Sequence, residues 1–211
     1  HWPAEKVLGL VREVQGEEWV QTLLQQDRAL IALTPHLGQW EMMGLVASRY
    51  KPSTSLYRPL RMTTLDQPIT RARERTGNRL APTTGRGIRA IYAAIRRREM
   101  VGILPDQVPG GEQGVFAPFF GIEAYSMTFV SRLAAAYDAD VVITYAERLP
   151  RSRGFRIVVL PVDESIHSKE LAVSVAALNR AVELAVRQVP SQYQWIYKRF
   201  KKRPTGEPPF Y

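Results

Sequence analysis

The stretch that decides the fold is ALIALTP, residues 29–35, in which five apolar residues in a row stop at a threonine and a proline. A short continuous apolar run of this kind is typical of a strand that is buried on both faces of a sheet. The stretch VGILP, residues 101–105, repeats the pattern and again stops at a proline. Two such strands, separated by segments of helical periodicity, predict an α/β fold.

Segments with helical periodicity surround these two strands. They cover residues 38–50, 65–76, 87–98, 127–137 and 169–188, while residues 2–28 fit two short amphipathic helices separated near Gly16. Further strands are expected at residues 55–57, 139–146 and 155–160. We therefore expect a mixed, largely parallel sheet flanked by helices, closed by an antiparallel pair near residues 140–160, in a single domain over residues 1–211.

The composition narrows the class of protein. The 211-residue chain contains no cysteine, which excludes disulfides, thiol nucleophiles and cysteine-ligated metal sites. Its 29 Lys and Arg residues against 20 Asp and Glu residues leave a net charge of +9. This charge favours an anionic partner, whether nucleic acid, an acidic protein or anionic lipid. No segment approaches the roughly 18 uninterrupted apolar residues of a membrane-spanning helix.

A candidate site lies in HLGQWE, residues 36–41, directly after the first buried strand, because ligands of open α/β sheets collect where strands end. The other two histidines, His1 and His167, stand at the chain start and in a polar stretch. If a helix begins two residues after His36, the Glu41 carboxylate can reach back to one imidazole nitrogen and leave the other free as a general base. A purely structural histidine fits the same spacing equally well.

Motifs for other chemistries are missing. The sequence has no G-x-S-x-G nucleophile elbow, no P-loop and no H-E-x-x-H zinc motif, so we expect no metal and no cofactor. What remains is a base that deprotonates a substrate hydroxyl, which then attacks an activated carbonyl directly. Residues 85–90, GRGIRA, match a dinucleotide fingerprint, but the preceding RLAPTT is too polar for the buried strand that this motif needs. A glycine turn with a threonine cap before a helix is therefore the preferred interpretation of these residues.

A basic cluster lies near the C-terminus. Its five cations follow three aromatic residues: Tyr193, Trp195 and Tyr197, then Lys198, Arg199, Lys201, Lys202 and Arg203. Aromatic rings beside cations suit a membrane interface, where rings sit at headgroup depth and cations meet phosphate. They also suit stacking and phosphate contacts on nucleic acid. The basic cluster alone leaves both kinds of partner open.

Four blocks of sequence follow one another in order: TPHLGQWEMMG (34–44), LYRP (56–59), LPDQ to GVFAPFFG (104–121) and PSQYQWIYKRFKKRP (190–204). Together they resemble the bacterial lipid A late acyltransferases, the lauroyl/myristoyl acyltransferase family, over nearly the whole chain. The resemblance implies a glycerolipid-acyltransferase-like α/β fold. It also implies transfer of a fatty acyl chain from acyl carrier protein to a hydroxyl of an anionic lipid A precursor, at the cytoplasmic face of the bacterial inner membrane. No nucleic-acid partner is then expected.

The same resemblance assigns roles to individual residues. His36 and Glu41 match the family's catalytic dyad, in which Glu41 orients His36 and His36 deprotonates the acceptor hydroxyl without an acyl-enzyme intermediate. Arg73 and Asp106 match an arginine and an aspartate of the family, with two other arginines of the same helix as close rivals of Arg73. Arg73, Asp106 and Arg58 are expected to bind substrate, and no residue is expected to bind a metal.

The chain departs from the family pattern in two respects. Leu37, Gln39 and Tyr197 stand where other residues are common, and the hydrophobic anchor with which the family usually begins is missing. We expect either that the given sequence lacks a native N-terminal membrane anchor or that the protein binds the membrane only through its surface, and in both cases that surface cations and aromatic rings contact the membrane. Because related enzymes acylate other lipids, another glycolipid or a phospholipid is an alternative acceptor. A thioester hydrolase is the nearest enzymatic alternative, and a basic nucleic-acid-binding protein is the alternative from a different class.

Overall fold

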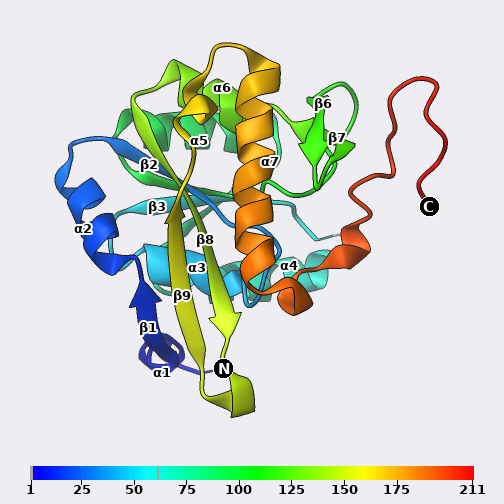
Figure 1. Cartoon of the computed structure of the whole chain (residues 1–211). Coiled ribbons are helices and arrows are strands. Elements are labelled where there is room, and N and C mark those ends of the chain that lie inside the picture. Colours follow the sequence, from blue (N-terminus) through cyan, green and yellow to red (C-terminus); the bar gives the residue numbers. More distant parts are fainter. Residues whose placement is uncertain (1, 61) are drawn as a thin grey trace.

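The computed structural model describes residues 2–60 and 62–211, and Figure 1 shows its ribbon; His1 lies outside the described residues. Within them, seven strands form one sheet in the order β1-β9-β8-β2-β5-β3-β4, and β6 and β7 form a separate hairpin. The strands are β1 (Val11–Gln15), β2 (Ala29–Leu33), β3 (Ser53–Tyr57), β4 (Arg79–Pro82), β5 (Met100–Ile103), β6 (Gly114–Phe119), β7 (Ile122–Met127), β8 (Ala139–Arg148) and β9 (Phe155–Pro161). The α-helices are α1 (Ala4–Leu8), α2 (Glu17–Gln25), α3 (Glu41–Ala47), α4 (Thr63–Glu74), α5 (Gly85–Arg96), α6 (Phe129–Ala136) and α7 (Leu171–Gln188).

The sheet is largely parallel. Strands β8, β2, β5, β3 and β4 pair in parallel with one another, and β9 is antiparallel to β8 but parallel to β1. The predicted mixed α/β architecture, with an antiparallel pair near residues 140–160, is therefore confirmed.

Strand β2 lies in the middle of the sheet, and all five of its residues are buried. Ala29, Ile31 and Leu33 belong to the hydrophobic core shared with α5, α6 and α7. Leu30 and Ala32 point to the opposite face, where side chains of α2 and α3 cover them. Because both faces are covered, the strand needs an unbroken apolar run rather than an alternating one. Figure 1 shows α7 in front of the sheet and α3 behind it.

Of the two helices expected over residues 2–28, the second is present as α2, whereas the first ends at Leu8 and residues 11–15 form the edge strand β1. The pairing of β1 with β9 slips in register between Val11 and Glu13. Such an irregularity puts Val11 and Val14, which are three residues apart, against the same hydrophobic cluster. Apolar residues three positions apart are also typical of one face of a helix, so the sequence pattern predicted a helix where the structure has a strand.

Two further strand regions were missed by the sequence prediction. The hairpin of β6 and β7 turns at Phe120 and Gly121, both with positive φ, which is the backbone of a tight two-residue hairpin loop. The polar segment before α5 forms β4, which pairs only with β3 at the edge of the sheet. An edge strand tolerates proline and polar residues that a buried strand does not.

Among residues 2–60 and 62–211, no helix combines the length and the apolar content required to cross a bilayer.

The loop after β2 is held in place by a close approach of two backbones. Gly38 has φ +60°, and a Cβ added to it would lie 2.0 Å from the carbonyl oxygen of Ala146 in β8. The neighbouring Gln39 N–H donates to that same carbonyl at 2.7 Å, and the Gly38 N–H donates to the Gln192 carbonyl at 3.0 Å. Helix α3 therefore begins at Glu41 rather than at residue 38, and the loop is pinned between β8 and the C-terminal segment.

This close approach predicts a large effect of Gly38→Ala. The new Cβ meets a backbone oxygen that has little room to move, and alanine disfavours a left-handed conformation by about 1–2 kcal/mol. We expect a loss of about 2–3 kcal/mol in the free energy of unfolding, measured by urea denaturation. Gly110→Ala is the matched control, since no atom lies within 4 Å of the added Cβ. Equal stability of the two variants would contradict this account of the loop.

Candidate active site

The site is assembled at the edge where two neighbouring parallel strands end. Leu33 of β2 pairs in register with Ile103 of β5, so the segments that follow both strands leave the sheet at the same edge. His36 comes three residues after the first of these, and Asp106 three residues after the second. This is the edge at which open α/β sheets carry their binding sites.

His36 and Asp106 make two hydrogen bonds to each other. The backbone N–H of His36 donates to Oδ2 of Asp106 at 2.8 Å, and the Nδ1 atom of the imidazole lies 2.8 Å from Oδ1. The side chains are 5% and 0% exposed, so the pair is withdrawn from water. A buried carboxylate needs such partners, and here one residue supplies both of them.

The contact with Asp106 assigns the tautomer of His36. A carboxylate accepts hydrogen bonds, so Nδ1 carries the proton and Nε2 keeps its lone pair in the neutral ring. The amide nitrogen of Gln107 lies 3.4 Å from Nε2 and can donate a weak hydrogen bond to it. The arrangement therefore leaves Nε2 free to accept a proton from a substrate that displaces Gln107.

Two aromatic rings hold the imidazole from its sides. The centroid of the Trp40 ring lies 5.1 Å from that of His36, and the centroid of the Tyr197 ring lies 4.4 Å from it. Trp40 precedes α3, whereas Tyr197 comes from the C-terminal segment. The ring of His36 is thus fixed by contacts as well as by its hydrogen bond.

Glu41 makes no hydrogen bond or ion pair with the imidazole, which corrects the expected geometry of the His36 and Glu41 pair. Its carboxylate forms an ion pair with Arg73 of α4 instead, and the Arg73 guanidinium lies 5.5 Å from the centroid of the Trp40 ring. The first turn of α3 points Glu41 outward, where its side chain is 44% exposed. The carboxylate that bonds to the imidazole is therefore that of Asp106 and not that of Glu41.

The five expected site residues therefore fall into three groups. His36 pairs with Asp106, and Glu41 pairs with Arg73 beside Trp40. Arg58 is exposed in the segment after β3, and among the described residues it makes no hydrogen bond or ion pair with the other four.

Behind Asp106 lies a buried polar group that the sequence interpretation did not place in the site. Arg199 is only 5% exposed and donates to the Tyr125 carbonyl, to Ser126 Oγ and to Asn179 Oδ1. Burial lowers the pKa of Arg199, and the nearby charge of Asp106 partly offsets this effect. Burial and the same carboxylate raise the pKa of Tyr193. The block PSQYQWIYKRF was visible in the sequence, but nothing in its pattern separated these inward residues from the surface cations.

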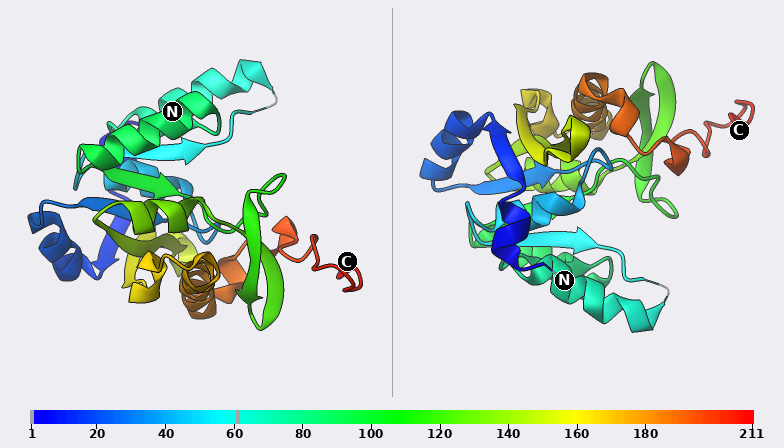
Figure 2. Two further views of the ribbon diagram at one scale, coloured as in Figure 1. Left: turned by 90° about the horizontal axis from the view of Figure 1, so that it is seen from above. Right: turned by 90° about the horizontal axis from the view of Figure 1, so that it is seen from below.

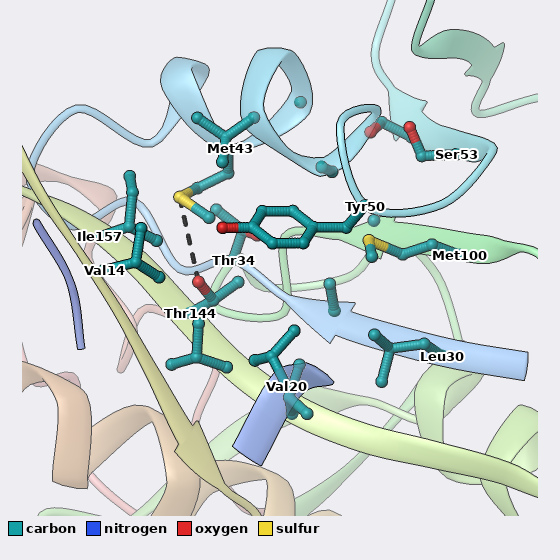
Figure 3. Close-up of a pocket in the computed structure, with 18 residues that line it drawn as sticks. Val14, Val20, Leu30, Thr34, Met43, Tyr50, Ser53, Met100, Thr144 and Ile157 are labelled. Carbon is teal, nitrogen blue, oxygen red and sulfur yellow. Dashed lines mark hydrogen bonds between the residues drawn. The ribbon is translucent and has the colours of Figure 1, made fainter. Parts of the chain in front are cut away.

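An apolar cavity opens beside the site, between α3 and the sheet. Figure 3 shows this inner cavity, lined by apolar side chains that include Leu30, Met43, Tyr50, Met100 and Ile157. A second hollow, the outer pocket, is lined by Trp40, Glu41 and Arg73 among others. Both hollows share Thr34, Met43, Gly44, Ser55 and Gly102. The two hollows therefore lie side by side: the Glu41 and Arg73 pair lines the outer pocket, and mostly apolar side chains line the inner cavity.

Within residues 2–60 and 62–211, no three His, Asp or Glu side chains gather in an arrangement that can hold an ion.

Comparisons with known proteins identify the family. The profile of the bacterial lipid A biosynthesis acyltransferases matches residues 2–202. The chain therefore belongs to the bacterial lipid A biosynthesis acyltransferase family, as the four sequence blocks predicted, and this membership supports an acyl transfer to lipid A.

Three relatives from Escherichia coli (strain K12) illustrate the similarity. The lipid A biosynthesis palmitoleoyltransferase is 30% identical over 214 residues, which cover 100% of this chain and 68% of the relative. The lipid A biosynthesis lauroyltransferase is 27% identical over 211 residues, with the same coverage of 100% and 68%. The lipid A biosynthesis myristoyltransferase is 26% identical over 194 residues, which cover 92% of this chain and 60% of the relative.

The contact between His36 and Asp106 predicts the effect of Asp106→Asn. An amide in this place can donate to Nδ1, which puts the imidazole proton on Nε2 and removes the free lone pair. We expect acyl transfer to fall by about a hundredfold or more.

Asp140→Asn is the matched control, because Asp140 pairs with Arg28 at the opposite edge of the sheet. Acyl transfer by both variants would be measured alongside their unfolding curves. If Asp106→Asn kept wild-type turnover in a folded protein, the carboxylate would have no part in orienting His36.

Proposed function

We propose that this protein is an O-acyltransferase that moves a fatty acyl chain from acyl carrier protein to a hydroxyl of a lipid A precursor. The observation that carries the proposal is the buried His36 and Asp106 pair at the sheet edge, next to an apolar cavity. Family membership supports the class of reaction. The donor, the acceptor hydroxyl and the order of steps are the proposed part.

The reaction proceeds by direct transfer. Nε2 of His36 takes the proton from the acceptor hydroxyl as its oxygen attacks the thioester carbonyl, and a tetrahedral intermediate forms. When the carbon–sulfur bond breaks, the imidazolium returns the proton to the departing thiolate of the carrier. Atoms and charges balance without a covalent enzyme intermediate, and the absence of cysteine removes one common nucleophile for such an intermediate.

Asp106 and Glu41 have different roles in this mechanism. Asp106 accepts the Nδ1 hydrogen bond, fixes the tautomer and stabilises the imidazolium that forms during attack. Glu41 holds Arg73 at the outer pocket, where the guanidinium can contact phosphate on the acceptor or the developing oxyanion. Arg58, exposed in the segment after β3, is a further cation for the anionic acceptor.

The inner cavity receives the acyl chain. Its walls are almost entirely apolar, and burial of a hydrocarbon chain is favourable by about 0.8 kcal/mol for each methylene group. The relatives are named for palmitoleoyl, lauroyl and myristoyl transfer, so their names differ in the acyl group. We therefore expect the acyl group that this protein transfers to depend on the depth of its own inner cavity.

Acyl carrier protein is the proposed donor, and its acidic surface would complement the net charge of +9. The acceptor lies in the cytoplasmic leaflet of the bacterial inner membrane, so the enzyme must work at that surface. Trp195 and Ile196 are 55% and 83% exposed, directly before Tyr197, which contacts His36. In both views of Figure 2 the C-terminal segment projects from the molecule on the same side as the β6–β7 hairpin. These residues form the proposed membrane contact.

The basic cluster splits into an outer and an inner part. Lys198, Lys201 and Lys202 remain at or near the surface, whereas Arg199 is turned into the protein, as is the aromatic Tyr193. The outer lysines and the exposed Trp195 suit anionic headgroups, since cations meet phosphate where aromatic rings sit at the interface.

The proposal is tested by transfer of a labelled acyl chain from acyl carrier protein to a lipid A precursor. We expect His36→Ala to reduce this transfer by about a hundredfold or more, because the general base is lost. His167→Ala is the control, since His167 lies beside the carbonyl of Ala134, away from the site. Wild-type transfer that survives His36→Ala would refute the mechanism.

Analysis of the products separates the remaining enzymatic alternatives. Free fatty acid in the presence of the acceptor would indicate a thioester hydrolase. Acylation of another glycolipid or of a phospholipid, but not of the lipid A precursor, would change the acceptor while leaving the chemistry intact.

The membrane contact predicts that Ile196→Asp weakens binding to vesicles that contain anionic phospholipid. Burial of an isoleucine side chain contributes about 1.5–3 kcal/mol, so the partition coefficient should fall at least about tenfold. Vesicle sedimentation measures the effect. Val173→Asp is the control, because Val173 is also exposed but lies at the start of α7. Identical partitioning of both variants would rule out this surface as the contact.

A further inference from the structure

The inner cavity extends along the sheet, away from the reacting atoms. Thr34 lies just past the end of β2 and two residues before His36, whereas Leu30 lies near the start of the same strand. Four residues of strand span about 13 Å at about 3.3 Å per residue. The cavity therefore runs from Thr34, at the end nearer to His36, to Leu30 and Met100 at its far, deep end.

Two glycines line both hollows, and each is packed closely against a neighbouring polar side chain. A Cβ on Gly102 would lie 2.8 Å from Ser55 Oγ, and one on Gly44 would lie 3.1 Å from Asn78 Nδ2. Gly44 lies inside α3, where glycine is less favourable than alanine by about 1 kcal/mol. A glycine at this position is explained by the close approach of the Asn78 side chain rather than by helix stability.

The ring of Tyr50 occupies the inner cavity. Figure 3 shows it lying between Met43 of α3 and the strands below, with Met100 beside it. It packs against the cluster of Leu30 and Met100 and also against the cluster of Met43 and Ile157, so it bridges the helix and the sheet. With the ring in place, the cavity measures about 60 Å³, which leaves little room for a long hydrocarbon chain.

A hydrogen bond holds the ring in this position. The hydroxyl of Tyr50 donates to Glu17 Oε1 of α2 at 3.1 Å, and burial raises the pKa of Tyr50. The neutral phenol is therefore the form present, and it links the loop after α3 to α2. The lining around the ring includes the flexible side chains of Met43 and Met100, which adapt to a ligand at little cost.

We propose that Tyr50 sets the length of the acyl chain that the enzyme accepts, by closing the deep end of the inner cavity. This inference rests on the proposed acyl transfer. An acyl chain that enters from the end near Thr34 runs along β2 and β5 until it meets the ring. A longer chain must displace the ring and break its contacts with both clusters, so it binds less well.

The test is a competition among acyl carrier proteins loaded with short, medium and long saturated chains, with a lipid A precursor as acceptor. Mass spectrometry of the acylated product gives the ratio of long to short chains. We expect Tyr50→Ala to raise this ratio by about tenfold or more, because even one methylene group in an apolar pocket discriminates by about that factor. Tyr50→Phe keeps the ring and should keep the wild-type ratio.

A second variant acts in the opposite direction and does not depend on the folding of Tyr50→Ala. Ala47 also lines the inner cavity, so Ala47→Phe should fill it and lower the ratio of long to short chains. Tyr92→Ala is the matched control, because Tyr92 is a partly buried tyrosine packed on the other face of the sheet. Its ratio should equal that of the wild type.

The outcomes separate a failure of the proposed acyl transfer from a failure of the proposed role of Tyr50. If the wild type transfers no acyl chain to any acceptor, the proposed function fails. If the wild type transfers chains but the ratio stays unchanged in folded Tyr50→Ala and in Ala47→Phe, only the role of Tyr50 is overturned.

Discussion

The double hydrogen bond between His36 and Asp106 is the interaction on which the rest of the site depends. It exists because β2 and β5 are parallel neighbours, so chain segments 70 residues apart leave the sheet at one edge. The same carboxylate holds the backbone of the loop after β2 and the imidazole ring, so loop position and catalytic tautomer are coupled. Withdrawal from water strengthens both contacts, because the local dielectric is low.

A second layer of structure keeps this pair in place. The C-terminal segment accepts a hydrogen bond from Gly38, packs Tyr197 on the imidazole and turns Arg199 inward behind Asp106. One stretch of sequence thus serves the interior and the surface at once, because Ile196 between these residues faces outward. The site and the proposed membrane contact are therefore built by the same few residues.

The strands that the sequence predicted correctly are those with a clear local pattern of apolar residues. The buried run at residues 29–33 was identified to the residue, because a strand covered on both faces admits little besides apolar side chains. Strand β1 was mistaken for a helix because its register slip places apolar residues three positions apart, as in a helix. Strand β4 and the β6–β7 hairpin were missed because edge and hairpin strands lack a continuous apolar run. His36 was found from its place after a strand, whereas its partner was misassigned to the nearest carboxylate in sequence.

The sequence by itself determined the α/β class, the family and the position of His36, since these depend on short-range patterns and on ordered motifs. Only the tertiary structure decided that His36 pairs with Asp106, that Glu41 pairs with Arg73, and that the ring of Tyr50 lies inside the cavity. Spacing along a helix or strand specifies neighbours within one element. Contacts between elements depend on strand order and on how helices cover the sheet, which the packing of the whole chain sets.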